Sequence, residues 1–205
     1  MKVIHLISGG DSGGAKTHVL SLLQHLNETI TAQLVCFRDG PFAEEARAMG
    51  IPTRICGGNN IPKLRRELTA YIREGGYQVI HCHGSRANMV GALLRGSTGL
   101  PVVSTVHSDY KLDYMGRPIS RLTFGSINAW ALRRLDYRIG VSDAMVDLLI
   151  SRGFAPDRFF AIYNGIDFTP PPPQGNRLAY LRGLGAEVDE DSVVVGIAAR
   201  LNPVK

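Results

Sequence analysis

The sequence predicts an α/β protein built on a doubly wound parallel sheet. Short runs rich in valine and isoleucine recur along the chain, and segments with apolar residues at helical spacing lie between them. Strands covered by helices on both faces are continuously apolar, as these runs are. Strand and helix alternate five or six times, which is typical of this fold class, and ligands of such sheets bind beyond the carboxyl ends of the strands.

Six apolar runs are the expected strands: residues 3–8, 33–37, 53–56, 78–81, 102–106 and 137–141. The helical pattern is clearest before the fourth of them. There Ile61, Leu64, Leu68 and Ile72 are spaced by three or four residues and share one helix face.

The regular pattern stops near Asp167. Four consecutive prolines at 170–173 cannot join a sheet ladder and predict a stiff polyproline spacer, with a ligand for a proline-binding domain as the alternative. Residues 176–184 then predict a helix and 193–198 a buried strand. We therefore expect a first domain over 1–167, a linker over 168–175, and the truncated start of a second α/β domain over 176–205.

Composition excludes disordered, collagen-like and coiled-coil classes, because 44% of the 205 residues are hydrophobic and 20% charged. The three cysteines show no CxxC spacing and predict reduced core residues. The apolar run at the N-terminus is too short for a secretory signal, and no run approaches the roughly 18 residues of a membrane span. We expect a cytoplasmic protein that at most rests on a membrane.

Four glycines in six residues, at positions 9, 10, 13 and 14, follow the first expected strand, and a helix begins near Ala15. Glycine lets the backbone approach a ligand closely, and the amides and dipole of a first helical turn favour an anion. We expect a phosphate or diphosphate here. The alternative is a tight strand-to-helix connection without a ligand.

Three motif matches in the chain fail on inspection. Residues 10–14 match the nucleophile segment of trypsin-like proteases, but only eleven residues precede Ser12, too few for the upstream base and carboxylate. Residues 10–17 approach the P-loop pattern, but Ala15 occupies a glycine position. Residues 189–191 match the DxD pattern of metal-dependent sugar transferases, yet they lie in an acidic run that predicts a solvated turn.

Histidines gather at the ends of two expected strands. His81 and His83 share one strand face, and His107 follows the next strand. A zinc site would need a third and usually a fourth ligand, for which His18 and His107 are the nearby candidates. Packed core histidines and a metal site are the alternatives. We expect histidines that contact a ligand in a cleft, and no metal.

Six segments in this order and spacing resemble family 4 glycosyltransferases: residues 13–19, 79–83, 104–107, 140–142, 163–167 and 196–205. The resemblance implies the GT-B architecture, in which two Rossmann-like domains face each other across a cleft. It implies hexosyl-type transfer from a nucleotide-diphosphate sugar to a sugar or lipid-linked acceptor, with retention of configuration and without a metal or other cofactor.

The resemblance also assigns roles to residues. Gly13 and Gly14 would place amides at the donor diphosphate, with Arg200 and Lys205 on the opposite side of the cleft, and His107 would lie beside the donor sugar as the catalytic candidate. Three residues become candidates for substrate binding: Lys16, His83 and Asn164.

One departure from the family concerns its E-x7-E carboxylate pair, which would lie past Lys205. We therefore expect the N-terminal half of a transferase, inactive alone. Two alternatives stay open: a sugar-nucleotide epimerase of GT-B-like architecture and a non-enzymatic α/β binding module.

Basic residues on the expected helices suggest contact with anionic lipid, although solvated helix faces explain them equally well. They are Lys63, Arg65, Arg66, Arg73, Arg117, Arg121, Arg133 and Arg134. The helices lack interleaved aromatic residues and any nucleic-acid reading motif, so we expect no nucleic-acid partner.

Overall fold

The computed structural model describes residues 1–10, 14–111, 125–165 and 175–196. The chain divides into two compact units, Met1–Gly165 and Ile166–Lys205. Several residues singled out above lie outside the described part: Gly13, Arg117, Arg121, the prolines at 170–173, Arg200 and Lys205.

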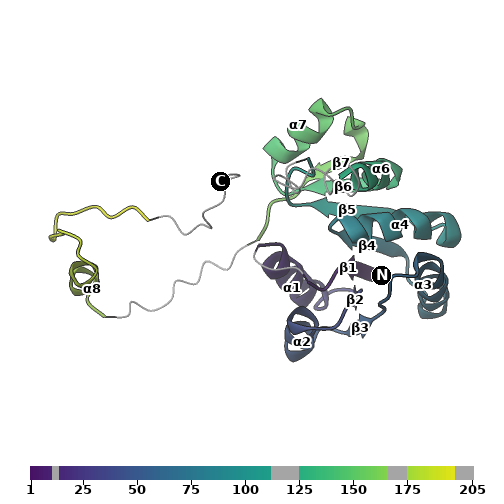
Figure 1. The fold of residues 1–205 in the computed structure, drawn as a ribbon, viewed down its shortest axis with the longest axis horizontal. Coiled ribbons are helices and arrows are strands. Elements are labelled where there is room, and N and C mark those ends of the chain that lie inside the picture. Colours follow the sequence, from purple (N-terminus) through teal and green to yellow (C-terminus); the bar gives the residue numbers. More distant parts are fainter. Residues whose placement is uncertain (11–13, 112–124, 166–174, 197–205) are drawn as a thin grey trace. The chain divides into compact units, whose positions relative to one another are not determined.

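The first unit is built on a seven-stranded sheet in the order β3-β2-β1-β4-β5-β6-β7 (Figure 1). Every neighbouring pair is parallel, so the predicted fold class is confirmed. The strand order reverses between β1 and β4, the crevice where ligands of such sheets bind. The strands are β1 Lys2–Ile7, β2 Thr31–Cys36, β3 Thr53–Ile55, β4 Val79–His83, β5 Val102–Val106, β6 Tyr137–Gly140 and β7 Phe159–Ala161.

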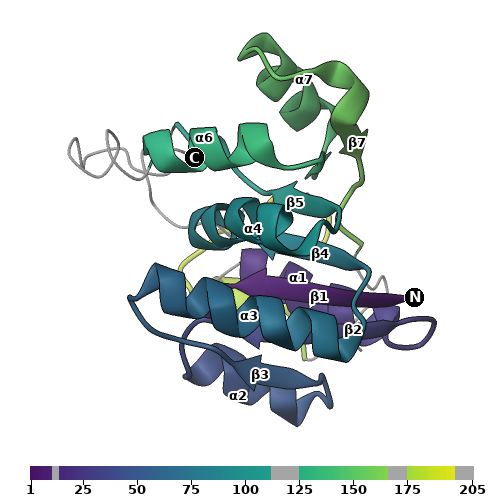
Figure 2. The same ribbon diagram turned by 90° about the vertical axis from the view of Figure 1, so that its right-hand side faces the viewer.

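Helices cover both faces of this sheet (Figures 1 and 2). On one face lie α1 Gly14–Leu26 and α2 Pro41–Ala48, and on the other α3 Ile61–Gly75, α4 Ser85–Thr98 and α6 Ser126–Arg134. α7 Asp143–Ser151 packs against β6 and β7. No helix in the described segments has the length and apolar character required to span a bilayer.

Alternation along the central strands decides which side chains meet α1. Ile4 and Leu6 of β1, with Ile80 and Cys82 of β4, belong to the core on the α3–α4 side. Successive strand residues point to opposite faces, so His5, His81 and His83 face the α1 side. The three cysteines are buried and form no disulfide bond, as predicted from their spacing.

The helix predicted from apolar spacing forms as α3. Leu64, Leu68 and Ile72 are its buried residues. Asn60 caps its N-terminus by accepting a hydrogen bond from the Lys63 amide, and Gly76 ends it in the left-handed region with φ of 63°.

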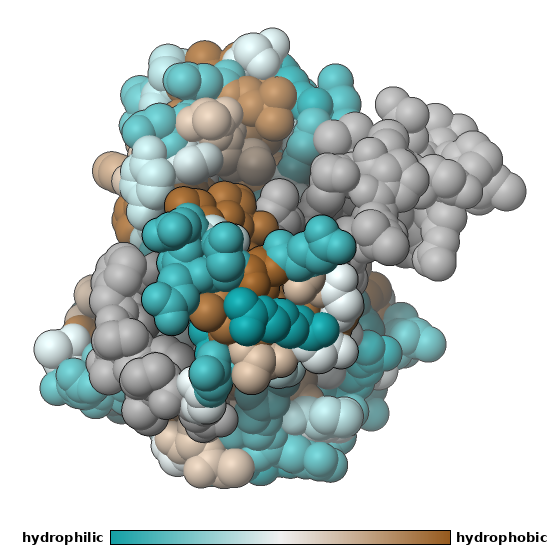
Figure 3. Space-filling view, turned by 90° about the vertical axis from the view of Figure 1, so that its left-hand side faces the viewer, coloured by the Kyte–Doolittle hydropathy of each residue, from teal (hydrophilic) through white to brown (hydrophobic). Residues whose placement is uncertain are grey.

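The second unit contains α8 Arg177–Gly183, where the sequence predicts a helix, with Asn176 as its N-terminal cap. The strand expected over 193–198 does not form in its described part, because a strand needs a hydrogen-bonding neighbour and residues 175–196 provide none. Val193 and Val195 are 89% and 85% exposed. On the face drawn in Figure 3, hydrophobic residues, coloured brown, are exposed among hydrophilic ones, coloured teal.

Candidate functional site

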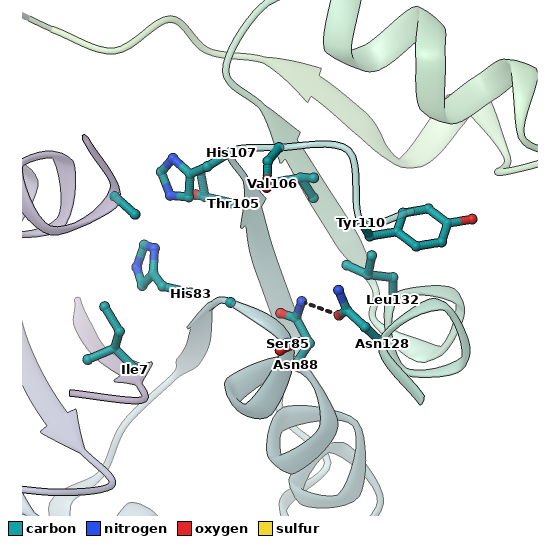
Figure 4. A pocket seen from close by; sticks show the side chains of 13 residues that line it. Ile7, His83, Ser85, Asn88, Thr105, Val106, His107, Tyr110, Asn128 and Leu132 are labelled. Atoms are coloured by element: carbon teal, nitrogen blue, oxygen red, sulfur yellow. Dashed lines mark hydrogen bonds between the residues drawn. The ribbon is translucent and has the colours of Figure 1, made fainter. Parts of the chain in front are cut away.

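A cavity of about 230 Å³ opens at the carboxyl ends of β4 and β5 (Figure 4). His83 ends β4, and His107 directly follows β5. Both imidazoles line the cavity, together with Ala15 from the first turn of α1 and Ser85 from the start of α4. The cavity therefore lies at the reversal of strand order, where the fold class predicts a ligand.

Two helices begin at this cavity. In the part of the chain that the structure describes, neither α1 nor α4 carries an acidic side chain in its first turn, and Gly84, the N-terminal cap of α4, supplies no side-chain hydrogen bond to the helix. A β-carbon built on Gly14 would meet no atom of the described residues within 4 Å, so these residues leave the space beside that backbone open. Main-chain amides and two helix dipoles thus favour an anion in the cavity.

Gly9 has a different role from Gly14. It leaves β1 with φ of +83°, and a β-carbon there would lie 2.6 Å from the carbonyl oxygen of Arg38. Gly9 is therefore required by the turn itself, whereas Gly14 leaves room for a ligand.

Five imidazoles cluster at the cavity. His83 and His107 line it, and the rings of His5, His18 and His81 pack against them. His5 of β1 is opposite His81 of β4 in the parallel register, and their ring centroids are 4.7 Å apart. The His18 ring on α1 lies 4.8 Å from that of His107. Figure 4 shows His83 and His107 at the ends of their strands, on the same side of the cavity.

Hydrogen bonds satisfy only part of this group. Nδ1 of His5 lies 3.1 Å from Nε2 of His83, and Nε2 of His81 lies 2.8 Å from the hydroxyl of Thr105. Four buried ring nitrogens have no hydrogen-bond partner in the described structure: His5 Nε2, His18 Nε2, His83 Nδ1 and His107 Nε2. Buried polar atoms are normally paired, so the unpartnered nitrogens mark a place for a ligand or water.

Burial keeps these rings neutral. Desolvation lowers the pKa of His5 to about 3 and that of His107 to about 4, with repulsion from His18 adding to both effects. Desolvation likewise lowers the pKa values of His18, His81 and His83. At neutral pH the imidazoles therefore offer hydrogen-bond donors and lone pairs, not positive charge.

The floor of the cavity is a buried polar network. Asn88 of α4 donates from Nδ2 to Oδ1 of Asn128 on α6 at 2.9 Å (Figure 4). The Ser104 hydroxyl donates to Oδ1 of Asn88 at 2.7 Å. The three side chains link α4, α6 and β5 beneath the cavity. Sequence reasoning did not identify this network.

An ion pair anchors the segment that follows His107. Asp109 pairs with Arg152, whose guanidinium lies 5.4 Å from the ring centre of Tyr110. Tyr110 is buried and makes an edge contact with Phe154. The backbone that carries His107 is thus tied to the chain that follows α7.

The remaining predicted site residues have different surroundings. Gly14 begins α1 beside the cavity. Lys16 forms an ion pair with Glu45 of α2 and is not among the residues that line the cavity. Asn164 forms a hydrogen bond with His18. The sequence analysis did not predict His5 as a site residue, because it lies inside an apolar run and only the pairing of β1 with β4 brings it next to His81 and His83.

A second, apolar cavity of about 270 Å³ adjoins the first. Ile61, Met89 and Ile127 line it, and Ser85 lines both cavities. The two cavities therefore meet at Ser85, the first residue of α4.

Comparisons with known proteins agree with the fold. The model of the family "Glycosyltransferase Family 4" matches residues 12–169. The structure of HepE from Anabaena in complex with UDP-glucose has 22% identity and a TM-score of 0.67, over 82% of this chain and 44% of that one.

Two curated relatives match most of the chain. A D-inositol 3-phosphate glycosyltransferase 1 from Catenulispora acidiphila is 26% identical over 96% of this chain and 51% of its own length. A UDP-Gal:alpha-D-GlcNAc-diphosphoundecaprenol alpha-1,3-galactosyltransferase from Escherichia coli is 24% identical over 87% of this chain and 48% of its own length. The chain thus spans about half the length of these relatives. On its family match over residues 12–169, this chain belongs to glycosyltransferase family 4.

Proposed function

We propose that the first unit forms one wall of the active site of a sugar transferase that uses a nucleotide-diphosphate donor. One observation carries this proposal: the N-termini of α1 and α4 open onto the same cavity, beside imidazoles whose nitrogens lack partners. Main-chain amides hold the donor diphosphate, and His83 and His107 hydrogen-bond to the donor sugar.

The positive ends of the two helix dipoles at the cavity suit the departure of a diphosphate. When the bond between the anomeric carbon and the phosphate oxygen breaks, negative charge grows on the leaving group and the sugar becomes oxocarbenium-like. Helix dipoles stabilise that negative charge without a metal ion, while neutral imidazoles orient the sugar. The acceptor oxygen bonds to the same face of the sugar, with retention of configuration, and its proton passes to the leaving phosphate.

The proposed donor is a UDP-hexose, in line with the names of the relatives. The HepE structure holds UDP-glucose, and the name of the Escherichia coli relative specifies UDP-Gal. Arg200 and Lys205, which lie outside the described residues, are proposed to add positive charge to diphosphate binding. His107 is the proposed catalytic residue because it lies beside the cavity with an unpartnered Nε2.

The apolar second cavity is the proposed entry for a lipid-linked acceptor. It adjoins the donor cavity at Ser85, and the name of the Escherichia coli relative specifies a diphosphoundecaprenol acceptor. Exposed Trp130 and Ile127 on α6, with Arg134 stacked on Trp130, provide a surface for peripheral contact with the anionic cytoplasmic face of a membrane.

The test has two arms. Amide NMR of the 205-residue chain with UDP and UDP-glucose measures donor contact at Gly14, Ala15 and Ser85. A transfer assay with a panel of nucleotide sugars, with the Escherichia coli relative as positive control, measures turnover. We expect donor contact without turnover, since the chain spans about half of that relative. Absence of any donor contact at α1 and α4 would overturn the proposal.

A further inference from the structure

The five imidazoles contain two overlapping sets of three. His5, His81 and His83 form one set, and His18, His83 and His107 form the other. In each set, the ring nitrogens that the residues offer lie within 4.8 Å of one another. The two sets differ in how the rings are oriented and in which nitrogens are already used.

Two internal hydrogen bonds tie the first set together, and Nε2 of His5 stays without a partner among the described residues. His5 bonds to His83, and His81 bonds to Thr105. The His5 and His83 rings are 11° from parallel, and the His81 and His83 rings 25°. Lone pairs of imidazole lie in the ring plane, so nearly parallel rings do not direct them at one point. This set is a packed core.

The second set is less parallel. His18 is inclined by 70° to His107 and by 58° to His83, whereas His83 and His107 are inclined by 31°. Each of the three residues has one buried ring nitrogen without a hydrogen-bond partner among the described residues: Nε2 of His18, Nδ1 of His83 and Nε2 of His107. Inclined rings with unused nitrogens can converge on a single atom. The cavity that His83 and His107 line leads an ion to this set.

Two of the rings have hydrogen-bond partners inside the protein. Nε2 of His83 is hydrogen-bonded to His5, and Nδ1 of His83 has no partner among the described residues. The His18 side chain hydrogen-bonds to Asn164, and Nε2 of His18 is without a partner among the same residues. A second hydrogen bond of this kind fixes the tautomer and orientation of metal-binding histidines.

The geometry points to a site for a divalent transition metal, of the Zn²⁺ class, held by His18, His83 and His107, with a water in the cavity as the fourth ligand. Three imidazoles with one open position suit tetrahedral Zn²⁺. Ring nitrogens around such an ion are about 3.3 Å apart. The ligand atoms that the three residues offer lie within 4.8 Å of one another, so the rings must move closer together to bind the ion. An all-nitrogen set does not suit Mg²⁺ or Ca²⁺, which prefer oxygen.

The metal has no role in the proposed transfer, but its site overlaps the proposed donor site. A bound ion would use the same nitrogens of His83 and His107 that the donor sugar is proposed to contact. Metal occupancy would therefore compete with the donor.

The test uses the untagged 205-residue chain after treatment with a chelator. Calorimetric titration with Zn²⁺ and the visible absorption of added Co²⁺ both report on the site without any activity assay. We expect one ion per chain and a saturable visible Co²⁺ band. His18→Gln and His107→Gln should each weaken binding at least roughly tenfold. Far-ultraviolet circular dichroism verifies that each variant is folded.

His25→Gln is the matched control. His25 lies on α1 like His18, but its side chain is 73% exposed and pairs with Glu28. This variant should bind the metal as the parent chain does. Absence of a saturable Co²⁺ band, or binding that survives both His18→Gln and His107→Gln unchanged, overturns the inference. Neither result bears on donor binding, which the NMR titration with UDP measures separately.

Discussion

His5 and His83 share a buried hydrogen bond, with Nδ1 of His5 3.1 Å from Nε2 of His83. The bond joins the two central strands, β1 and β4, on the side covered by α1. It leaves Nε2 of His5 and Nδ1 of His83 without partners. A fully buried imidazole pair thus supports the cavity wall while remaining uncharged.

Stability should fall as the pH is lowered because of this pair. The unfolded chain protonates His5 near pH 6.5, whereas burial lowers the folded pKa to about 3. Between these values the unfolded state binds more protons, so acid favours unfolding. Lowering the pH from 7 to 5 should reduce the free energy of unfolding by about 2 kcal/mol through the protonation of His5 alone. Urea unfolding at both pH values measures the difference.

Two variants separate His5 from the other histidines. In His5→Asn the stability difference between pH 7 and pH 5 should shrink by about 2 kcal/mol. In His25→Gln, which alters an exposed histidine, the difference should stay as in the parent chain. An equal pH dependence in His5→Asn and the parent would contradict a neutral, buried His5.

Gly14→Ala should separate ligand binding from folding. A β-carbon at Gly14 meets no atom of the described residues within 4 Å, so the free energy of unfolding should stay the same or rise by at most about 1 kcal/mol. The same carbon would occupy the space proposed for the diphosphate, so UDP affinity should fall roughly tenfold. Calorimetric titration and urea unfolding measure the two effects.

Gly9→Ala is the contrasting variant. Its positive φ and the Arg38 carbonyl at 2.6 Å should cost about 1–3 kcal/mol of stability. If Gly14→Ala loses stability like Gly9→Ala and still binds UDP, then Gly14 serves only the turn.

Asn88→Ala should destabilise the protein through the groups left behind. Asn128 and Ser104 would each lose a buried partner, at a cost of about 1–3 kcal/mol per group. Thr69→Ala, which removes a partly buried hydroxyl bond to Ser97, is a milder comparison at roughly 1 kcal/mol. Equal losses in the two variants would show that the network contributes little.

Asp109→Asn should loosen the segment after β5. Asp109 and Arg152 have side chains only 9% and 15% exposed, and breaking a buried pair costs roughly 3 kcal/mol or more. Asp39→Asn, which breaks an exposed pair with Arg47, should cost at most about 1 kcal/mol. If Asp109→Asn proves as stable as Asp39→Asn, the ion pair between Asp109 and Arg152 does not stabilise the segment after β5.

Most of the sheet was predictable because its strands are buried on both faces and are therefore continuously apolar. β7 was not predicted, since three residues over Phe159–Ala161 are too few for a periodic signal and are largely exposed. The bounds of α3 follow from local chemistry: the Asn60 side chain caps its N-terminus, and Gly76 ends it in the left-handed region.

The site was predictable only in outline. The glycines and the His-x-His segment indicated a ligand at the strand ends, but which strands are neighbours is set by tertiary structure. His5 faces His81 because β1 pairs with β4, far away in sequence. Likewise, Lys16 meets Glu45 through the packing of α1 and α2, which no local pattern encodes.

The amide NMR spectrum of the 205-residue chain, titrated with UDP, tests most directly whether the two helix N-termini hold a diphosphate. The account predicts saturable shifts that are largest at Gly14, Ala15, Gly84 and Ser85, and lost in Gly14→Asp, whose carboxylate would repel the ligand. Shifts confined to other parts of the chain, or none at millimolar UDP, would contradict it.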